Sequence, residues 1–385
     1  MRSQAALNHD ADKVGVPTVW EVVDGVPHDD PALESEWEAL AVRRGAPRSA
    51  PSCVLPWYRF VLAEPARARI VVARRDGRVV GIWPLFHTRD TWGFVTYRMA
   101  GHQTIVGVEP LAVRDDIAAK EALVAGLAGL RPVPDRVELE CVEDPYDWLG
   151  AARAAFPSWR AQVRTDASRA PFFELDDETY STWVEHRRTG GGKSVRRYTR
   201  RLADHGYHPR RFTEPAEIVA RLPALRRLYL ARKAARGGWG ADFDDAMLAM
   251  VSDVVASLVD GERVVLYSVE RDADDVAAVD LVLVAGNSAN LWIGGIGDVL
   301  PQYSPGQVNL TAIIDDSHAA GLRILSLGPG EEDYKSRYST GAQDVVAAAL
   351  VRHSRSLTHL NTPATFLPSG ARDLARQLKA RVKRS

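Results

Sequence analysis

The sequence is poor in cysteine, and its two cysteines stand far apart. Cys53 and Cys141 belong to no Cys-x-x-Cys pair and have no pair of histidines nearby. A disulfide-rich scaffold or a structural zinc site is built from such clusters, so neither is expected. We interpret both cysteines as buried small apolar residues and expect no metal.

Long apolar runs and an excess of one charge are also missing. No stretch approaches the roughly 18 apolar residues of a membrane span, and the opening MRSQAALNHDADK lacks the apolar core of a signal peptide. The 49 basic and 50 acidic side chains leave a formal net charge of -1. No global field therefore draws the chain to nucleic acid or anionic lipid. We expect a cytoplasmic protein without a membrane span or a DNA partner.

The 385 residues predict two domains, because a domain usually has about 100 to 200 residues. The same order of elements occurs twice: a hairpin, a strand, a helix and a strand. In the first copy, Asp76 and Gly77 join two β-rich runs, and Asp-Gly suits the positive φ angles of a type I′ turn. The elements expected in this copy are strands at 69–75, 78–86 and 92–98, a helix at 117–130 and a strand at 136–142.

The second copy follows two helical regions, around 180–205 and 218–259. It comprises strands at 263–271, 276–285 and 290–296, a helix at 305–320, and strands at 323–327 and 344–352. This repetition predicts an α+β (α/β) fold of tandem domains, each with a mixed, mostly antiparallel sheet flanked by helices. The expected divisions are a disordered N-terminus at 1–18, domains at 19–165 and 166–356, and a basic C-terminal tail at 357–385.

The segment YSPGQVNL at 303–310 carries the strongest local signal. Ser304 suits a helix N-cap, Pro305 suits the first helical position, and Gln307 would complete a capping box. Gly306 removes a side chain where backbone N–H groups point outward, so a phosphate could approach the helix N-terminus. A tight strand-to-helix connection without a ligand explains the same residues.

The next strand ends in a glycine turn and the run EEDYKSRY at 331–338. The order of strand, SPG-helix, strand, glycine turn and EEDYK resembles the BioF2-like or CelD-like branch of the GNAT acyltransferase superfamily. The first half, with Trp37, Leu40 and the run VVGIWPL, is similar to the degenerate N-terminal domain of that family. The resemblance therefore covers most of the chain.

This resemblance implies that the third strand and the strand after the helix splay apart around the pantetheine of acetyl-CoA or another acyl-CoA. The carrier's pyrophosphate would then lie on the helix N-terminus. Tyr334 or Tyr338 would protonate the leaving thiolate, as a tyrosine does in many GNAT enzymes. The residues expected to bind the carrier are Trp292, Ser304, Gly306, Gln307, Val308, Asn309, Lys335 and Arg337.

Asp280 is the candidate general base, because it interrupts the apolar strand VAAVDLVLV. Burial raises the pKa of a carboxyl group toward the range useful for deprotonating an ammonium. An Asp paired with one of the many arginines explains the residue equally well. Glu331 is a second choice, and Ser326 stands where many family members have Asp.

Trp239 and Tyr303 are the candidate substrate contacts, Trp239 as an apolar wall on a basic, glycine-rich loop. The run GGGKS at 190–194 is no P-loop, because Arg187 stands where its first glycine should be. A basic helix begins there instead. It could contact the carrier's phosphates, an acyl carrier protein or a tRNA, although a charge run is more often a solvated face.

The leading hypothesis is an N-acyltransferase that moves an acyl group from acyl-CoA, with acetyl-CoA as the first choice. The acceptor is a primary amine of a small molecule or biosynthetic intermediate, and the transfer occurs by direct attack. Direct attack predicts no acyl-cysteine intermediate. One alternative is aminoacyl transfer from a charged tRNA, the chemistry of the related Fem-like proteins. Another is a non-catalytic GNAT-like module that binds a partner in a biosynthetic assembly.

Overall fold

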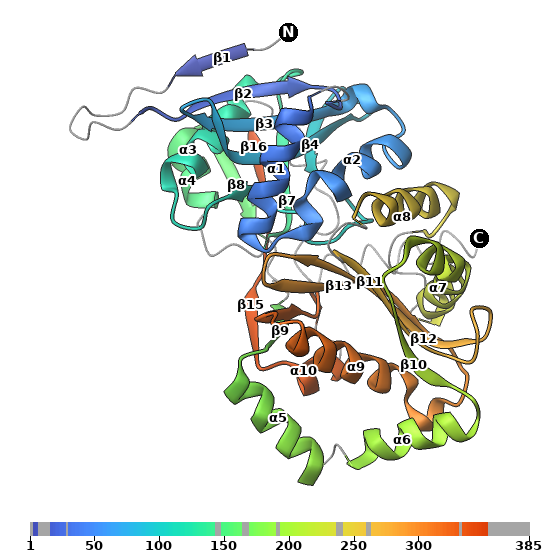
Figure 1. Cartoon of the computed structure of the whole chain (residues 1–385). Coiled ribbons are helices and arrows are strands. Elements are labelled where there is room, and N and C mark those ends of the chain that lie inside the picture. The colour runs from blue at the N-terminus through green and yellow to red at the C-terminus, as the bar shows by residue number, and fades with distance from the viewer. Residues whose placement is uncertain are drawn as a thin grey trace.

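The structure, a computed structural model, describes residues 3–6, 16–27, 30–142, 148–163, 169–189, 193–235, 242–258, 263–330 and 333–352. Two mixed sheets, each flanked by helices, lie one above the other in Figure 1. The predicted α+β class with two sheets is confirmed. No helix in the described ranges combines the length and the apolar character needed to cross a membrane.

The first sheet has nine strands in the order β1-β2-β3-β4-β5-β7-β16-β8, with β6 paired to β4. Four helices belong to this half of the molecule (Figure 1). The bounds are β1 (Ser3–Ala6), β2 (Val19–Asp24), α1 (Pro31–Arg44), α2 (Pro51–Phe60), β3 (Ala68–Arg75), β4 (Arg78–Arg89), β5 (Val95–Met99), β6 (Leu111–Ala112), α3 (Ile117–Gly126), β7 (Arg136–Val142), α4 (Trp148–Ala155), β8 (Trp159–Val163) and β16 (Val346–Arg352).

The second sheet has seven strands in the order β10-β11-β12-β13-β14-β9-β15. Among its helices, α9 packs on β11 and β12, and α7 packs on β12 and β13. The bounds are β9 (Arg169–Glu174), α5 (Asp177–Thr189), α6 (Lys193–Asp204), β10 (His208–Phe212), α7 (Pro215–Ala235), α8 (Asp245–Ser257), β11 (Val264–Glu270), β12 (Val276–Ala285), β13 (Ser288–Ile296), α9 (Pro305–Ala319), β14 (Ile324–Ser326), α10 (Asp333–Tyr338) and β15 (Gly341–Asp344).

Local sequence signals placed several boundaries correctly. Asp76 and Gly77 both have positive φ, 53° and 74°, as the type I′ turn between β3 and β4 requires. Gly321, with φ 73°, ends α9, and the N–H of Leu322 donates to the carbonyl of Ser317. Such bonds satisfy carbonyl groups that a helix end would otherwise leave unpaired.

The last predicted strand, at 344–352, is wrong as a single element of the second domain. Residues up to Asp344 form β15, which pairs with β9 in the second sheet. The chain then returns to the first sheet, where β16 lies between β7 and β8. Ala347 to Val351 are buried, and an apolar run without alternation suits a strand covered on both faces. The expected domain boundary at 356 therefore does not separate the two sheets.

One further expectation differs from the structure near the proposed divisions: Ser3–Ala6, expected to be disordered, pairs with β2. The division expected between 165 and 166 falls after β8 of the first sheet and before β9 of the second. The basic tail at 357–385 lies outside the described residues.

The largest buried cluster extends across both halves. It contains side chains from both sheets and their helices, including Trp37 of α1 and Leu266 of β11. Arg48, which is 4% exposed, crosses the interface: one terminal nitrogen donates to the carbonyl of Val106 and the other to that of Leu291 in β13 (3.1 and 3.0 Å). The first half therefore supports the strand that borders the candidate site.

Candidate active site

The second sheet opens in its middle, between β13 and β14. These parallel strands are paired from Ser288 with Ile324 to Asn290 with Ser326. β13 continues to Ile296, whereas β14 ends at Ser326 and the chain turns away at Gly328, which has φ 75°. The predicted splay of the third strand from the strand after the helix is thus present.

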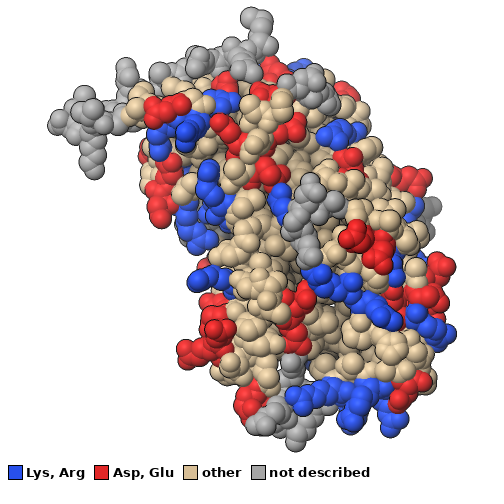
Figure 2. All heavy atoms as spheres, in the orientation of Figure 1, with Lys and Arg blue, Asp and Glu red and all other residues tan. Residues whose placement is uncertain are grey.

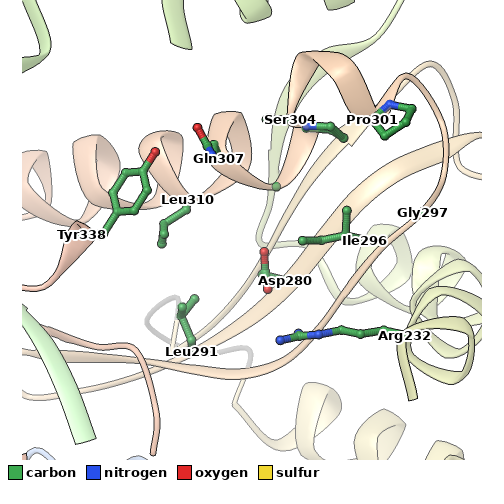
Figure 3. A pocket seen from close by; sticks show the side chains of 12 residues that line it. Arg232, Asp280, Leu291, Ile296, Gly297, Pro301, Ser304, Gln307, Leu310 and Tyr338 are labelled. Carbon is green, nitrogen blue, oxygen red and sulfur yellow. The ribbon is translucent and has the colours of Figure 1, made fainter. Parts of the chain in front are cut away.

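A cavity of about 260 Å³ lies at this opening (Figure 3). It is bounded by the beginning of α9, the splayed end of β13, one residue each from β12 and α7, and the last residue of α10. The side chains and backbone that line it belong to Arg232, Asp280, Leu291, Ile296, Gly297, Pro301, Ser304, Pro305, Gly306, Gln307, Leu310 and Tyr338.

α9 begins at Pro305 as predicted, but the capping box does not form. Ser304 has φ 45° and ψ 61°, in the left-handed region, and its side chain makes no cap hydrogen bond. An N-cap side chain reaches the first turn from an extended backbone, which Ser304 does not have. Its carbonyl instead accepts the N–H groups of Gln307 and Val308, at 2.9 and 3.3 Å. Ser304 and Gln307 both line the cavity (Figure 3).

Gly306 has a structural reason to be glycine besides the one predicted. A β-carbon there would lie 2.5 Å from Cδ1 of Ile296, which is closer than packed carbon atoms come. The glycine therefore lets the first turn of α9 approach the end of β13. Because both residues line the cavity, this close approach also shapes its entrance.

Asp280 lies in the cavity, on β12, and a hydrogen bond holds one of its carboxylate oxygens. Oδ2 accepts a hydrogen bond of 2.9 Å from Nδ2 of Asn309. Oδ1 lies where any side chain at position 294 would be: a β-carbon added to Gly294 would be only 1.9 Å from this oxygen. Burial raises the pKa of Asp280 to about 6, while the Asn309 hydrogen bond and the charge of Arg232 oppose that rise. The carboxylate can therefore accept a proton near neutral pH.

Asn309 and Val308, predicted to bind the carrier, point away from the cavity at the N-terminus of α9. Asn309 is fully buried and donates to Asp280 and, at 3.3 Å, to the carbonyl of Tyr267. Val308 packs in a cluster with Val195 and Leu202 of α6. Helical geometry explains this, since residues three or four positions beyond Pro305 face the sheet or α6 once the first turn faces the cavity.

Tyr338, one of two tyrosines considered as a proton donor, lines the cavity from the end of α10 (Figure 3). Tyr334 belongs to the same short helix, and its side chain lies outside the described residues. Glu331 and Trp239 also lie outside them. Of the candidate acids and bases, Asp280 and Tyr338 are therefore the pair that the described structure brings together.

Other predicted contacts lie elsewhere. Lys335 is 5% exposed and donates to the carbonyls of Gly328 and Pro329, at 3.1 and 2.8 Å, so its ammonium group closes the glycine turn. The residues that lie outside the set lining the cavity are Arg337, which is exposed on α10, Tyr303, whose ring stacks on His205, and Trp292, at the irregularity where β13 pairs with β12.

Two sequence signals for the cavity were missed. Arg232 was not among the candidate site residues, whereas it belongs to α7 and lines the cavity. Its spacing of four residues from buried Leu228 was the available signal, since both then lie on one helix face. Leu291 and Leu310 looked like ordinary core residues, and their periodicity alone could not separate a cavity wall from a packed core.

The Cys53 side chain is fully buried. Burial raises the pKa of the Cys53 thiol to about 12, so it stays protonated at neutral pH. The side chain of Cys141 lies outside the described residues. Within the described ranges no group of three or more His, Cys, Asp or Glu side chains could hold a metal ion.

The first sheet contains a counterpart of α9 that differs at its N-terminus. α3 follows the third main strand of that sheet, and Asp116 caps it by accepting the N–H of Ala119 at 3.0 Å. The same carboxylate pairs with Arg75 at 2.7 Å. An anion of the protein itself therefore occupies the helix terminus, where a phosphate would meet like charge.

Comparisons with protein families and with solved structures agree with this geometry. The family model described as an acetyltransferase (GNAT) domain matches residues 186–336, which include α9, β13, β14 and every residue that lines the cavity except Tyr338. No curated protein sequence matches the chain. Two solved structures share the fold across both sheets. FemX has a TM-score of 0.58 at 11% identity, over 86% of this chain and 98% of FemX. L-PGS from Bacillus licheniformis has a TM-score of 0.51 at 12% identity, over 88% of this chain and 95% of L-PGS.

The residues that match the family model include both splayed strands, β13 and β14. The identities to the solved structures are low, so these neighbours show a shared fold and nothing of a shared substrate. The family match covers residues 186–336, which is less than half of the chain. Within that range, the match to an acetyltransferase (GNAT) domain and the arrangement of β13, β14 and α9 agree with one another.

Proposed function

We propose that the protein is an N-acyltransferase that moves an acyl group from acyl-CoA to a primary amine by direct attack. The observation that carries the proposal is the cavity at the splay of β13 and β14, because it combines a helix N-terminus with a raised-pKa carboxyl group. The first turn of α9 would hold the diphosphate, and the gap would hold the pantetheine. Acetyl is the acyl group that we propose, and the BioF2-like or CelD-like branch is proposed from the sequence motif.

The reaction needs one base, one acid and correct positioning. Asp280 would take a proton from the ammonium group, and the free amine would attack the thioester carbonyl carbon. As the C–N bond forms, the C–S bond breaks and the thiolate leaves. Tyr338 would give its proton to that sulfur and would regain the proton that the nitrogen loses as the amide forms. The first proton, held on Asp280, would then leave to solvent. Ammonium and thioester thus give amide, thiol and one proton, and atoms and charge balance without an acyl-enzyme.

The proposal is tested by incubating the full chain with acetyl-CoA, longer acyl-CoA thioesters and a panel of primary amines. Thiol release that depends on the amine, together with an N-acylated product in mass spectrometry, is the expected result. An Asp280→Asn variant should lose most of the rate while still binding CoA. If calorimetry detects no CoA binding and no thioester is consumed, the proposal is wrong, and the alternative of a non-catalytic binding module is favoured.

A second candidate is aminoacyl transfer from a charged tRNA, and the surface of α6 favours it. Figure 2 shows basic side chains gathered at the lower edge of the molecule, where Figure 1 places α6. Four arginines of α6 are exposed: Arg196, Arg197, Arg200 and Arg201. The helix contacts α9, so a polyanion bound there would lie near the cavity. The two candidates differ in donor: only transfer from tRNA should stop with ribonuclease and fall steeply with salt.

A further inference from the structure

The cavity contains two side chains of opposite charge besides the tyrosine. Asp280 enters it from β12 and Arg232 enters it from α7. The charge of Arg232 is close enough to act on the ionisation of Asp280. The remaining lining residues are uncharged. A ligand in this part of the cavity therefore meets a cation and an anion together.

The backbone of β13 is built to let α7 come this close. A β-carbon at Gly295 would lie 2.6 Å from Cβ of Leu228, and one at Gly297 would lie 3.0 Å from Cδ2 of the same leucine. Arg232 is one helical turn beyond Leu228, on the same face of α7. The two glycines thus bring that face of α7 against the end of β13, where Arg232 reaches the cavity.

Arg232 lies apart from the residues proposed to hold the carrier. In Figure 3, Gln307 of α9 and Ser304, just before that helix, lie to one side of Asp280, and the guanidinium group of Arg232 lies to the other side. A diphosphate at the N-terminus of α9 would therefore not be held by this arginine. Its position is on the side of Asp280 that is left for the acceptor.

We infer that the acceptor is an amine that also carries an anionic oxygen group, a carboxylate or a phosphate, which Arg232 binds while the amine nitrogen faces Asp280. The inference rests on the proposed function and names the substrate class of that site. A guanidinium group presents paired N–H donors that match two oxygens of such a group. An ammonium compound without the anion would be attracted by Asp280 but repelled by Arg232. A zwitterion satisfies both charges, so the site selects for it and against the simple amine.

The inference is tested by equilibrium binding to the full chain, without any thioester, so that the result does not depend on catalysis. The probes are α-amino acids, their decarboxylated amines and O-phosphoethanolamine, each measured by calorimetry with the wild type and with Arg232→Gln. We expect the best zwitterion to bind about ten- to a hundredfold more tightly than its decarboxylated amine, and Arg232→Gln to abolish this difference. Comparing the amino acids with O-phosphoethanolamine identifies which anion is preferred.

Arg226→Gln is the matched control, because Arg226 lies on the same helix and pairs with the exposed carboxylate of Asp245. Its loss should leave the preference unchanged. Arg232→Lys keeps the charge without the paired donors and should keep part of the preference, which separates charge from folding defects. Equal binding of zwitterions and simple amines, binding of no probe, or a preference that survives Arg232→Gln overturns the inference. The CoA-binding assay tests the proposed function separately, because it needs no amine.

Discussion

The hydrogen bond from Asn309 to Asp280 makes a quantitative prediction about pH dependence. Nδ2 of Asn309 donates to Oδ2 of Asp280 at 2.9 Å, and this bond favours the ionised carboxylate. Asn309→Leu removes the donor from a fully buried position while keeping a similar side-chain volume. The carboxylate of Asp280 is then stabilised less, and its pKa should rise further above its ordinary value.

The size of the shift follows from the energy of the bond. A hydrogen bond to a charged group contributes about 1.5 to 3 kcal/mol, and one pKa unit corresponds to about 1.4 kcal/mol. From a starting pKa of about 6, the loss of the bond predicts a value of roughly 7 to 8. At pH near 6 the ionised fraction, and with it kcat/KM, should fall about five- to fiftyfold. Asp280 keeps some exposure to the cavity, so the lower part of this range is expected.

The assay is the pH profile of kcat/KM for one amine and one acyl-CoA, because this constant reports the ionisation of the free enzyme. The acceptor's own ionisation is the same for both proteins, so the difference between the profiles belongs to the variant. Thr311→Val is the control, since Thr311 is buried on the same helix and its hydroxyl has no hydrogen-bond partner in the described structure. An Asn309→Leu profile that coincides with the wild type would refute Asp280 as the base.

Three further predictions concern stability and carrier binding. The pKa of Asp280 is raised from 3.8 to about 6, so ionisation of this carboxyl group costs stability as pH rises through that interval. In urea unfolding, Asp280→Asn should therefore stabilise the fold by at most about 3 kcal/mol at about pH 8 and should not stabilise it at about pH 4. An equal effect at both pH values would contradict this prediction. Gly306→Ala should weaken CoA binding about tenfold, and adding Ile296→Val should not restore it; full recovery would mean that the glycine serves packing alone. Lys335→Met should cost about 1 to 3 kcal/mol of stability and leave the Kd for CoA unchanged, whereas a weaker Kd would return Lys335 to the carrier phosphates.

Short-range signals in the sequence determined much of the fold, because their physics involves neighbouring residues. Asp76-Gly77 required a turn with positive φ, Pro305 marked the first residue of α9, and Gly321 marked its end. The repeated order of hairpin, strand, helix and strand predicted two sheets. Asp280 was a candidate base because a carboxyl group within an apolar strand has few neighbours that can solvate it.

Contacts between distant residues decided the rest. Whether residues 346–352 extended the second sheet or completed the first depended on which sheet offered an open place, and that place lies between β7 and β8. Asn309 faces Asp280 rather than a carrier phosphate because α9 turns that side toward β12, an orientation set by packing. Arg232 reaches the cavity because Gly295 and Gly297, at and just beyond the end of β13, let α7 come close. Sequence spacing places residues along one element, whereas a site assembled from several elements depends on how those elements pack.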